Sequence, residues 1–246
     1  MVTLCLDFGN TRLKAGVFDG DNLREQIALE SDSNESIRKI LDLYRPRKTI
    51  LSSVINHNTE IEFILSSASL FHKVSHKTRI AFGIPSGKPE TVGADRIALI
   101  AAAVHFFPAK NNLVIALGSC ITYNFVNQYH QFLGGSISPG LRMRFKSMHD
   151  YTAKLPLIEE WNFVTGIPLV GYDTNTNIVS GVVNGITSEL DGIINKYAEK
   201  YSNFNVLLTG GNSTFFASQL KNKIFADSNF LFKGLYALSE LNNCGN

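Results

Sequence analysis

Three glycine-containing turns in this chain carry residue types that suit an anionic ligand. The first is Asp7-Phe8-Gly9-Asn10-Thr11, the second is Gly118-Ser119 and the third is Thr209-Gly210-Gly211. Glycine lets a backbone approach a ligand closely, and the amides of a tight turn bind anions. A single such turn is commonly only structural. Three of them in one chain predict a site for a phosphate tail and its divalent ion.

An ungapped internal repeat relates the first two turns. Aligning Leu4 with Leu113, 109 positions later, superposes the apolar strands on both sides of each turn. Two equivalent hairpins predict two related half-domains. The repeat is incomplete, because Ala116 occupies in the second copy the position that Asp7 has in the first.

The elements that must hold these turns alternate between strand and helix patterns. A three-stranded meander is expected first, and Ile37, Ile40 and Leu41 then lie on one face of a helix. Such an order is typical of α/β architecture. The expected elements of the first half are strands at 2–6, 13–18, 23–28, 49–54 and 71–74, a helix that follows the cap residues 31–34 and includes 37 to 44, and helices at 59–66 and 91–107.

The second half repeats the meander and then becomes more helical. The junction between the halves predicts domains at 1–110 and 111–246. Neither a Walker A loop nor a G-x-G-x-x-G turn is present, which excludes the P-loop and Rossmann folds. The expected elements are strands at 113–117, 121–126, 130–137 and 205–208, and helices at 141–151, 177–201, 214–222 and 235–241.

The composition excludes several functional classes. The chain has 246 residues, with 23 basic and 21 acidic side chains and no long basic run, so we expect no nucleic-acid partner. No apolar segment approaches the roughly 20 residues needed to cross a bilayer, so we expect no membrane partner. Three cysteines without metal-ligand spacing favour a reducing, cytoplasmic location.

Four segments, in order and over nearly the whole chain, resemble the type III pantothenate kinases. That family belongs to the superfamily of acetate and sugar kinases, heat-shock chaperones and actin. The resemblance implies two ribonuclease H-like domains of the actin-like ATPase fold, with a nucleotide cleft between them. The segments are Asp7-Phe8-Gly9-Asn10-Thr11-Arg12-Leu13-Lys14, Gly93-Ala94-Asp95-Arg96, Gly134-Gly135-Ser136-Ile137-Ser138-Pro139-Gly140 continuing to Thr152-Ala153-Lys154-Leu155-Pro156, and Thr209-Gly210-Gly211.

The same resemblance assigns substrate contacts. Asp95 is implied as the base that accepts the proton of the pantothenate hydroxyl, with Arg96 beside it to hold a phosphate or the substrate carboxylate. From the residues alone, Asp95 equally fits a helix cap or an ion pair. Thr174 is implied in pantothenate binding, and its alternative role is the N-cap of the long helix. The implied substrate-binding residues are Gly93, Ala94, Asp95, Arg96 and Thr174.

ATP is the implied co-substrate. Asp7 is implied to hold Mg²⁺ through water, since this ion keeps several waters and prefers carboxylate and phosphate oxygens. Ser119 replaces a family threonine and keeps its hydroxyl. The implied nucleotide-binding residues are Asp7, Phe8, Gly9, Asn10, Thr11, Arg12, Leu13, Lys14 and Ser119.

Three positions depart from the family pattern. Ala116 stands where an aspartate usually binds a monovalent cation, K⁺ or NH₄⁺, and a methyl group cannot coordinate it. Asn124 replaces a second acidic residue, and Ser86 stands where an aromatic residue is expected in the pantothenate pocket.

The leading hypothesis is an ATP-dependent kinase that converts pantothenate to 4'-phosphopantothenate, the first step of coenzyme A synthesis, as a homodimer. An alternative is a catalytically impaired relative with a regulatory or accessory nucleotide-binding role. A third is a sugar or acetate kinase of the same superfamily, which fits the segment from Gly134 to Pro156 less well.

Overall fold

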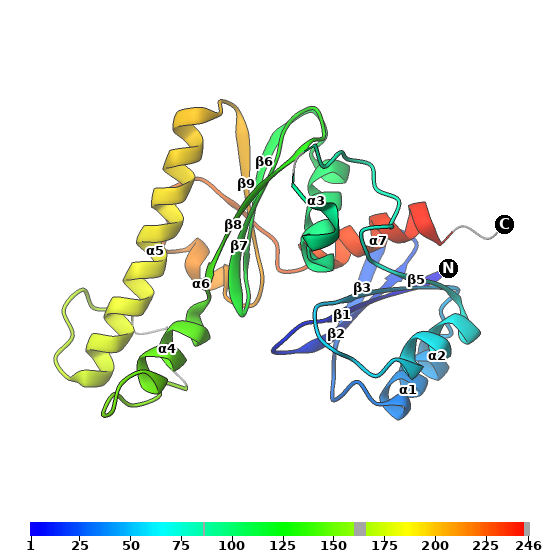
Figure 1. Ribbon diagram of the computed structural model, residues 1–246, viewed down its shortest axis with the longest axis horizontal. Helices are drawn as coiled ribbons and strands as arrows, with labels where there is room; N and C mark the ends of the chain where they lie inside the picture. Colours follow the sequence, from blue (N-terminus) through cyan, green and yellow to red (C-terminus); the bar gives the residue numbers. More distant parts are fainter. Residues whose placement is uncertain (86, 160–165, 244–246) are drawn as a thin grey trace. The chain divides into compact units, whose positions relative to one another are not determined.

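The computed structural model describes residues 1–85, 87–159 and 166–243. The chain divides into two compact units (Figure 1). The first comprises Met1–Ala109, Val126–Gly134 and Asn229–Asn246, and the second comprises Lys110–Phe125 and Gly135–Ser228. The second unit thus begins at the predicted junction between the two halves of the sequence. From Asn229 onward the chain belongs to the first unit again. The domain division at residue 110 stays a prediction.

The first unit is built on a five-stranded sheet of order β3-β2-β1-β4-β5. The predicted meander is confirmed, because β1, β2 and β3 pair antiparallel, and β1, β4 and β5 then pair parallel. The strands are β1 (Val2–Phe8), β2 (Leu13–Asp19), β3 (Asn22–Leu29), β4 (Lys48–Ser53) and β5 (Leu70–Lys73). The helices are α1 (Asn34–Tyr44), α2 (Glu60–Ala68), the 3₁₀ turn η1 (Pro89–Thr91), α3 (Ala94–Phe106) and α7 (Phe230–Asn242).

Helices cover both faces of this sheet (Figure 1). The apolar stripe of α1 is buried as predicted, against Leu6 and Phe8 of β1, and Ser33 caps the helix through its hydroxyl. The helices α3 and α7 pack on each other, and α7 contacts β1 and β4. The contact is close at Gly234, where a Cβ atom would lie 1.9 Å from the Ala98 carbonyl oxygen.

The second unit holds a sheet of order β10-β9-β6-β7-β8, in which β9 pairs parallel with β6 and β10. The predicted stripe of the long helix is buried on this sheet, from Ile178 to Ile194. Both sheets place the chain in the predicted α/β class. The elements are β6 (Asn111–Leu117), β7 (Cys120–Val126), β8 (Phe132–Pro139), α4 (Leu141–Asp150), α5 (Thr174–Lys200), β9 (Phe204–Thr209), α6 (Ser213–Ala217) and β10 (Phe225–Ala226).

Several predicted helix boundaries are wrong, among them the start of α7, which begins at Phe230 rather than at residue 235. The helix α3 begins at Ala94 rather than at residue 91, because η1 occupies the preceding residues. The helix α5 begins three residues early, at Thr174, behind a capping box. The helix α6 ends at Ala217, and beyond it Asp191 accepts hydrogen bonds from the backbone of 221 and 222.

No helix among the described residues combines the length and the apolar character that a membrane span requires.

Candidate functional site

The hairpin between β1 and β2 carries the first of the predicted anion-binding turns. Asp7 pairs with Lys14 across the hairpin, and the Gly9 amide donates to the Arg12 carbonyl at 3.2 Å. A Cβ atom at Gly9 would lie 3.3 Å from the same oxygen, so the tight turn favours glycine. The tip of the loop is exposed to solvent at Asn10, Thr11 and Arg12.

A pocket of about 500 Å³ opens beside this loop. Five of the eight residues of the predicted nucleotide loop, 7–14, line this pocket. This arrangement is compatible with the prediction that they share one ligand site. Ile55, from the segment after β4, also lines the pocket. The full lining is Gly9, Asn10, Thr11, Arg12, Leu13, Ala28, Leu29, Glu30 and Ile55.

Asp95 lies in the first turn of α3, as predicted. Its Oδ1 accepts a hydrogen bond from the Arg96 amide at 2.8 Å, where the helix terminus favours a negative charge. Gly93 is the residue before the helix, and a Cβ atom there would lie 2.6 Å from Oδ1 of Asp95. Glycine at 93 therefore leaves room for the carboxylate.

The structure brings Asp95 and Asp7 within electrostatic range of each other. Burial and then the charge of Asp95 raise the pKa of Asp7 to about 7, against the lowering effect of Lys14. Burial also raises the pKa of Asp95, although the Arg96 amide and its guanidinium oppose the shift. Perturbed carboxylates of this kind concentrate at functional sites. This pair is therefore the candidate chemical centre of the first unit.

Arg96 is half-buried beside Asp95. Its guanidinium carbon lies 5.5 Å from the centroid of the Phe132 ring, a cation–π geometry. Burial lowers the pKa of Arg96 and the Asp95 charge raises it, yet a guanidinium stays protonated at any physiological pH. Arg96 therefore supplies a fixed positive charge.

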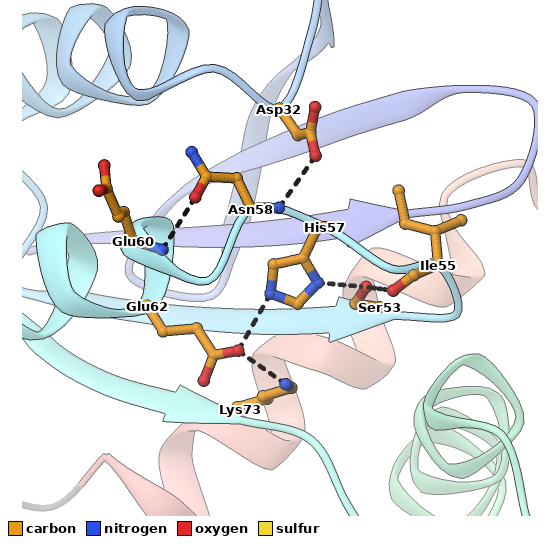
Figure 2. A network of polar contacts seen from close by, with 8 residues as sticks. All are labelled: Asp32, Ser53, Ile55, His57, Asn58, Glu60, Glu62 and Lys73. Atoms are coloured by element: carbon orange, nitrogen blue, oxygen red, sulfur yellow. Dashed lines mark hydrogen bonds and ion pairs between the residues drawn. The ribbon is translucent and has the colours of Figure 1, made fainter.

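A buried polar network supports the pocket wall (Figure 2). The His57 side chain is 5% exposed, with Nδ1 2.8 Å from the Ser53 hydroxyl and Nε2 3.0 Å from Oε1 of Glu62. The Ser53 hydroxyl donates to the Ile55 carbonyl at 3.1 Å, and Lys73 donates to Glu62 at 2.7 Å. Burial raises the pKa of Glu62, but the opposing effect of Lys73 and His57 is larger, so the pKa lies below its ordinary value. The network fixes the segment that carries Ile55.

We expect His57→Ala to lower the free energy of unfolding by about 2 kcal/mol, because it leaves a cavity and two polar groups without their partner. Urea denaturation monitored by circular dichroism measures the change. Lys73→Ala is the matched control, since its exposed ion pair with Glu62 contributes less than about 1 kcal/mol. Equal losses in the two variants would contradict the importance given to the buried ring.

In the second unit, two further turns of the predicted set come together. The Gly140 amide donates to the Ser119 carbonyl at 3.0 Å, and a Cβ atom at Gly140 would lie 2.2 Å from the Gly118 carbonyl oxygen. At Gly210 the backbone has φ +97°, and a Cβ atom would meet the Leu117 carbonyl oxygen at 2.5 Å. The second and third glycine turns therefore lie at one edge of the second sheet, with the β8–α4 turn.

Sequence reasoning missed the polar cluster behind this edge. Glu189 accepts hydrogen bonds from the hydroxyls of Tyr123 at 2.8 Å and Ser138 at 2.5 Å, and it also pairs with Arg144. Arg144 Nε donates to the Pro139 carbonyl at 2.8 Å, which ties the cluster to the β8–α4 turn. Burial, followed by the Glu189 contact, raises the pKa of Tyr123. These residues come from four separate elements, so no local motif could have indicated them.

Thr174 is exposed at the first position of α5. Its alternative role as the helix cap is wrong, because the Asp173 carboxylate accepts from the Thr176 amide at 2.7 Å and the Thr176 hydroxyl completes the capping box. The sequence signal was an aspartate followed three residues later by a hydroxyl. The Thr174 side chain is therefore not used as a cap.

The departures from the family pattern have definite environments. Ala116 is half-buried and pairs with Thr209, and Asn124 is buried with its amide donating to the Val114 carbonyl at 3.3 Å. Among the residues that the structure describes, no three His, Cys, Asp or Glu side chains are grouped to hold a metal ion. Ser86 lies outside the described residues.

Comparison with known proteins identifies relatives along nearly the whole chain. Residues 3–196 match the family model described as type III pantothenate kinase. A type III pantothenate kinase of Christiangramia forsetii is 41% identical over 98% of this chain and 99% of its own, and that of Flavobacterium johnsoniae is 40% identical over 94% and 95%.

The fold has wider relatives. A Campylobacter jejuni protein described as a putative Baf family transcriptional activator has a TM-score of 0.62 at 20% identity, covering 97% of this chain and 98% of its own. A putative N-acetylmannosamine kinase of Listeria monocytogenes has a TM-score of 0.55 at 12% identity, covering 98% and 99%. At these identities the similarity concerns the fold alone, and it agrees with the expected actin-like ATPase class.

Proposed function

Because the chain belongs to the type III pantothenate kinase family, we propose that it transfers the γ-phosphoryl group of ATP to the primary hydroxyl of pantothenate. The product is 4'-phosphopantothenate, the first intermediate of coenzyme A synthesis. The observation that carries the proposal is a pair of half-buried carboxylates, Asp7 and Asp95, which lie at the end of β1 and the start of α3 and have raised pKa values. Nothing in the comparisons favours the regulatory alternative.

Asp95 is the base of the proposed reaction. The pantothenate oxygen forms a bond to the γ-phosphorus, the bond from that phosphorus to the β,γ-bridging oxygen breaks, and ADP leaves with the electron pair. The hydroxyl proton passes to the Asp95 carboxylate. Burial raises the pKa of Asp95, which makes it a stronger base than an ordinary aspartate.

Positive charge and hydrogen-bond donors complete the proposed sites. Arg96 holds an anionic group of the substrate, for which its planar guanidinium is suited. Gly93 and Ala94 place the substrate beside Asp95, and the exposed Thr174 hydroxyl contributes to pantothenate binding. For ATP, we assign the phosphate-binding role to the Asp7–Lys14 loop, of which Gly9 to Leu13 line the pocket, and to the Ser119 turn.

The residues around Asp7 fit a hydrated Mg²⁺. The ion accepts few protein ligands and keeps its waters, so a carboxylate pair beside a phosphate loop suits it better than a protein cage. Asp7 would hold it, through water, with the ATP phosphates. When bound, the ion neutralises charge that develops on the phosphates during transfer.

A homodimer is the proposed assembly. Large apolar side chains are exposed on the second unit, in α4, in the segment after it and in the segment before α5. Thr174, the first residue of α5, directly follows the last of these segments. A second copy of the chain is the proposed partner of these exposed side chains. The side chains are Met143, Tyr151, Leu157, Leu169, Val170 and Tyr172. The cytoplasm is the proposed location.

Coupled measurement of ADP release tests the function and its cation requirement. With ATP and Mg²⁺, we expect turnover that depends on pantothenate and that is equal in potassium and in choline buffers, because Ala116 offers no oxygen ligand. The matched variant is Ala116→Asp, in which a carboxylate returns and K⁺ is expected to change the rate.

The absence of pantothenate-dependent ADP release in every salt would refute the kinase assignment. A wild-type rate that rises when K⁺ replaces choline would instead refute only the interpretation of Ala116.

A further inference from the structure

Ser52 has a fully buried hydroxyl that no side chain or backbone group satisfies. The residue is 0% exposed, and within the described part of the chain its Oγ and the Asn243 Oδ1 are the buried side-chain atoms without a hydrogen-bond partner. Asn243 is otherwise anchored, since its amide donates to the Thr49 carbonyl at 2.8 Å. Buried polar groups are nearly always paired, so the Ser52 hydroxyl requires an explanation.

Neighbouring hydroxyls in the same strand do find partners. The Thr49 hydroxyl lies 2.6 Å from the Ser69 hydroxyl, and Ser53 reaches both Ile55 and His57. The strand β4 therefore does not leave its hydroxyls unsatisfied as a rule. The exception at Ser52 is local, and it must be explained by what lies beside that position.

Asp7 is the residue beside it. The parallel pairing of β1 and β4 sets Ser52 opposite Asp7 in register. Side chains alternate between the faces of a sheet, and Leu6, Phe8 and Leu51 all lie in the core cluster with α1 and α2. Asp7 and Ser52 therefore share the other face, on which α3 packs against β4.

We propose that Ser52 is a positioning residue for the carboxylate of Asp7. Its hydroxyl donates a hydrogen bond to that carboxylate, or to a water of the Mg²⁺ that the carboxylate holds, when Mg²⁺ and nucleotide bind. This inference rests on the proposed function, because it needs Asp7 to serve the metal. A hydrogen bond to a charged group orients it without adding a charge of its own.

The energetics separate this role from a structural one. In the ligand-free structure the hydroxyl makes no hydrogen bond to a protein group, so its removal breaks no such bond. In the loaded protein the same removal deprives the carboxylate or its water of a donor. A positioning role therefore predicts an effect confined to the metal-loaded state.

The experiment compares wild type with Ser52→Ala in two measurements, unfolding without ligand and calorimetric titration with ADP. For Ser52→Ala we expect ligand-free stability equal to or above wild type. Affinity for ADP with Mg²⁺ is expected to fall about tenfold, and affinity for ADP in EDTA to be unchanged. Ser52→Cys has a weak S–H donor, so its affinity for ADP with Mg²⁺ should lie between those of wild type and Ser52→Ala. Thr49→Ala is the matched control, expected to lower ligand-free stability and to spare the metal-dependent affinity.

Equal metal-dependent affinity in wild type and Ser52→Ala would overturn the inference, as would a loss of ligand-free stability large enough to account for the binding defect. Both results leave pantothenate-dependent turnover of the wild type intact. If the wild type itself shows neither that turnover nor Mg²⁺-dependent ADP binding, the proposed function fails and this inference fails with it.

Discussion

Asp95→Asn is expected to reduce kcat by roughly 10²- to 10⁴-fold, the range that a positioned general base contributes. The amide keeps the shape of the side chain and can still accept from the Arg96 amide, so the first turn of α3 should remain intact. It cannot take the proton from the attacking hydroxyl. Steady-state ADP release measures kcat, and the KM for ATP should change little because the nucleotide loop is untouched.

Asp42→Asn serves as the control, because Asp42 is an exposed carboxylate on α1. It should retain wild-type kcat. A rate for Asp95→Asn within twofold of wild type would remove Asp95 from the role of base. The pH profile gives a second readout: the acidic fall of kcat/KM in wild type, which reports ionisation in the free enzyme, should be altered in the variant.

Asp7→Asn is expected to change stability and activity in opposite directions. In the ligand-free protein, burial and the nearby Asp95 raise the pKa of Asp7 from 3.8 to about 7. Roughly three pKa units at about 1.36 kcal/mol each predict that the variant is more stable than wild type by up to about 4 kcal/mol above pH 7. Turnover should be abolished, because the variant lacks the carboxylate that we propose to hold the metal.

The sign follows from proton linkage. A raised pKa means that the folded protein binds this proton more tightly than the unfolded chain does, so its contribution to stability is complete below pH 3.8 and is lost as pH rises through about 7. Denaturant unfolding in EDTA at pH 4 and pH 8 measures it. The variant should gain over wild type only at pH 8; a gain of the same size at both pH values would show that titration of Asp7 is not its cause.

Much of the fold could be predicted because its signals are local. The antiparallel meander follows from alternating apolar segments and turn residues, and the stripe from Ile178 to Ile194 follows from helical spacing. Boundaries failed where a neighbour decides them. The end of α6 is set by hydrogen bonds to Asp191, which is distant in the sequence.

The candidate site divides in the same way. The loop at Gly9 and the helix start at Asp95 have recognisable sequence patterns, and the structure places both in the first unit. Ser52 and Glu189 have none, because their importance comes from strand register in one case and from four converging elements in the other. The shifted pKa of Asp7 likewise depends on burial, which a sequence does not contain.

The packing of α7 has a consequence for how the protein is made. This helix completes the first unit by covering β1, β4 and α3, yet the ribosome produces it after the entire second unit. Until α7 has been synthesised, it cannot cover the face of the sheet on which Asp7 lies, and Ala98 lacks its contact with Gly234. A messenger RNA truncated before the α7 codons therefore yields a chain whose first unit cannot fold completely. Cellular proteases can degrade such a chain.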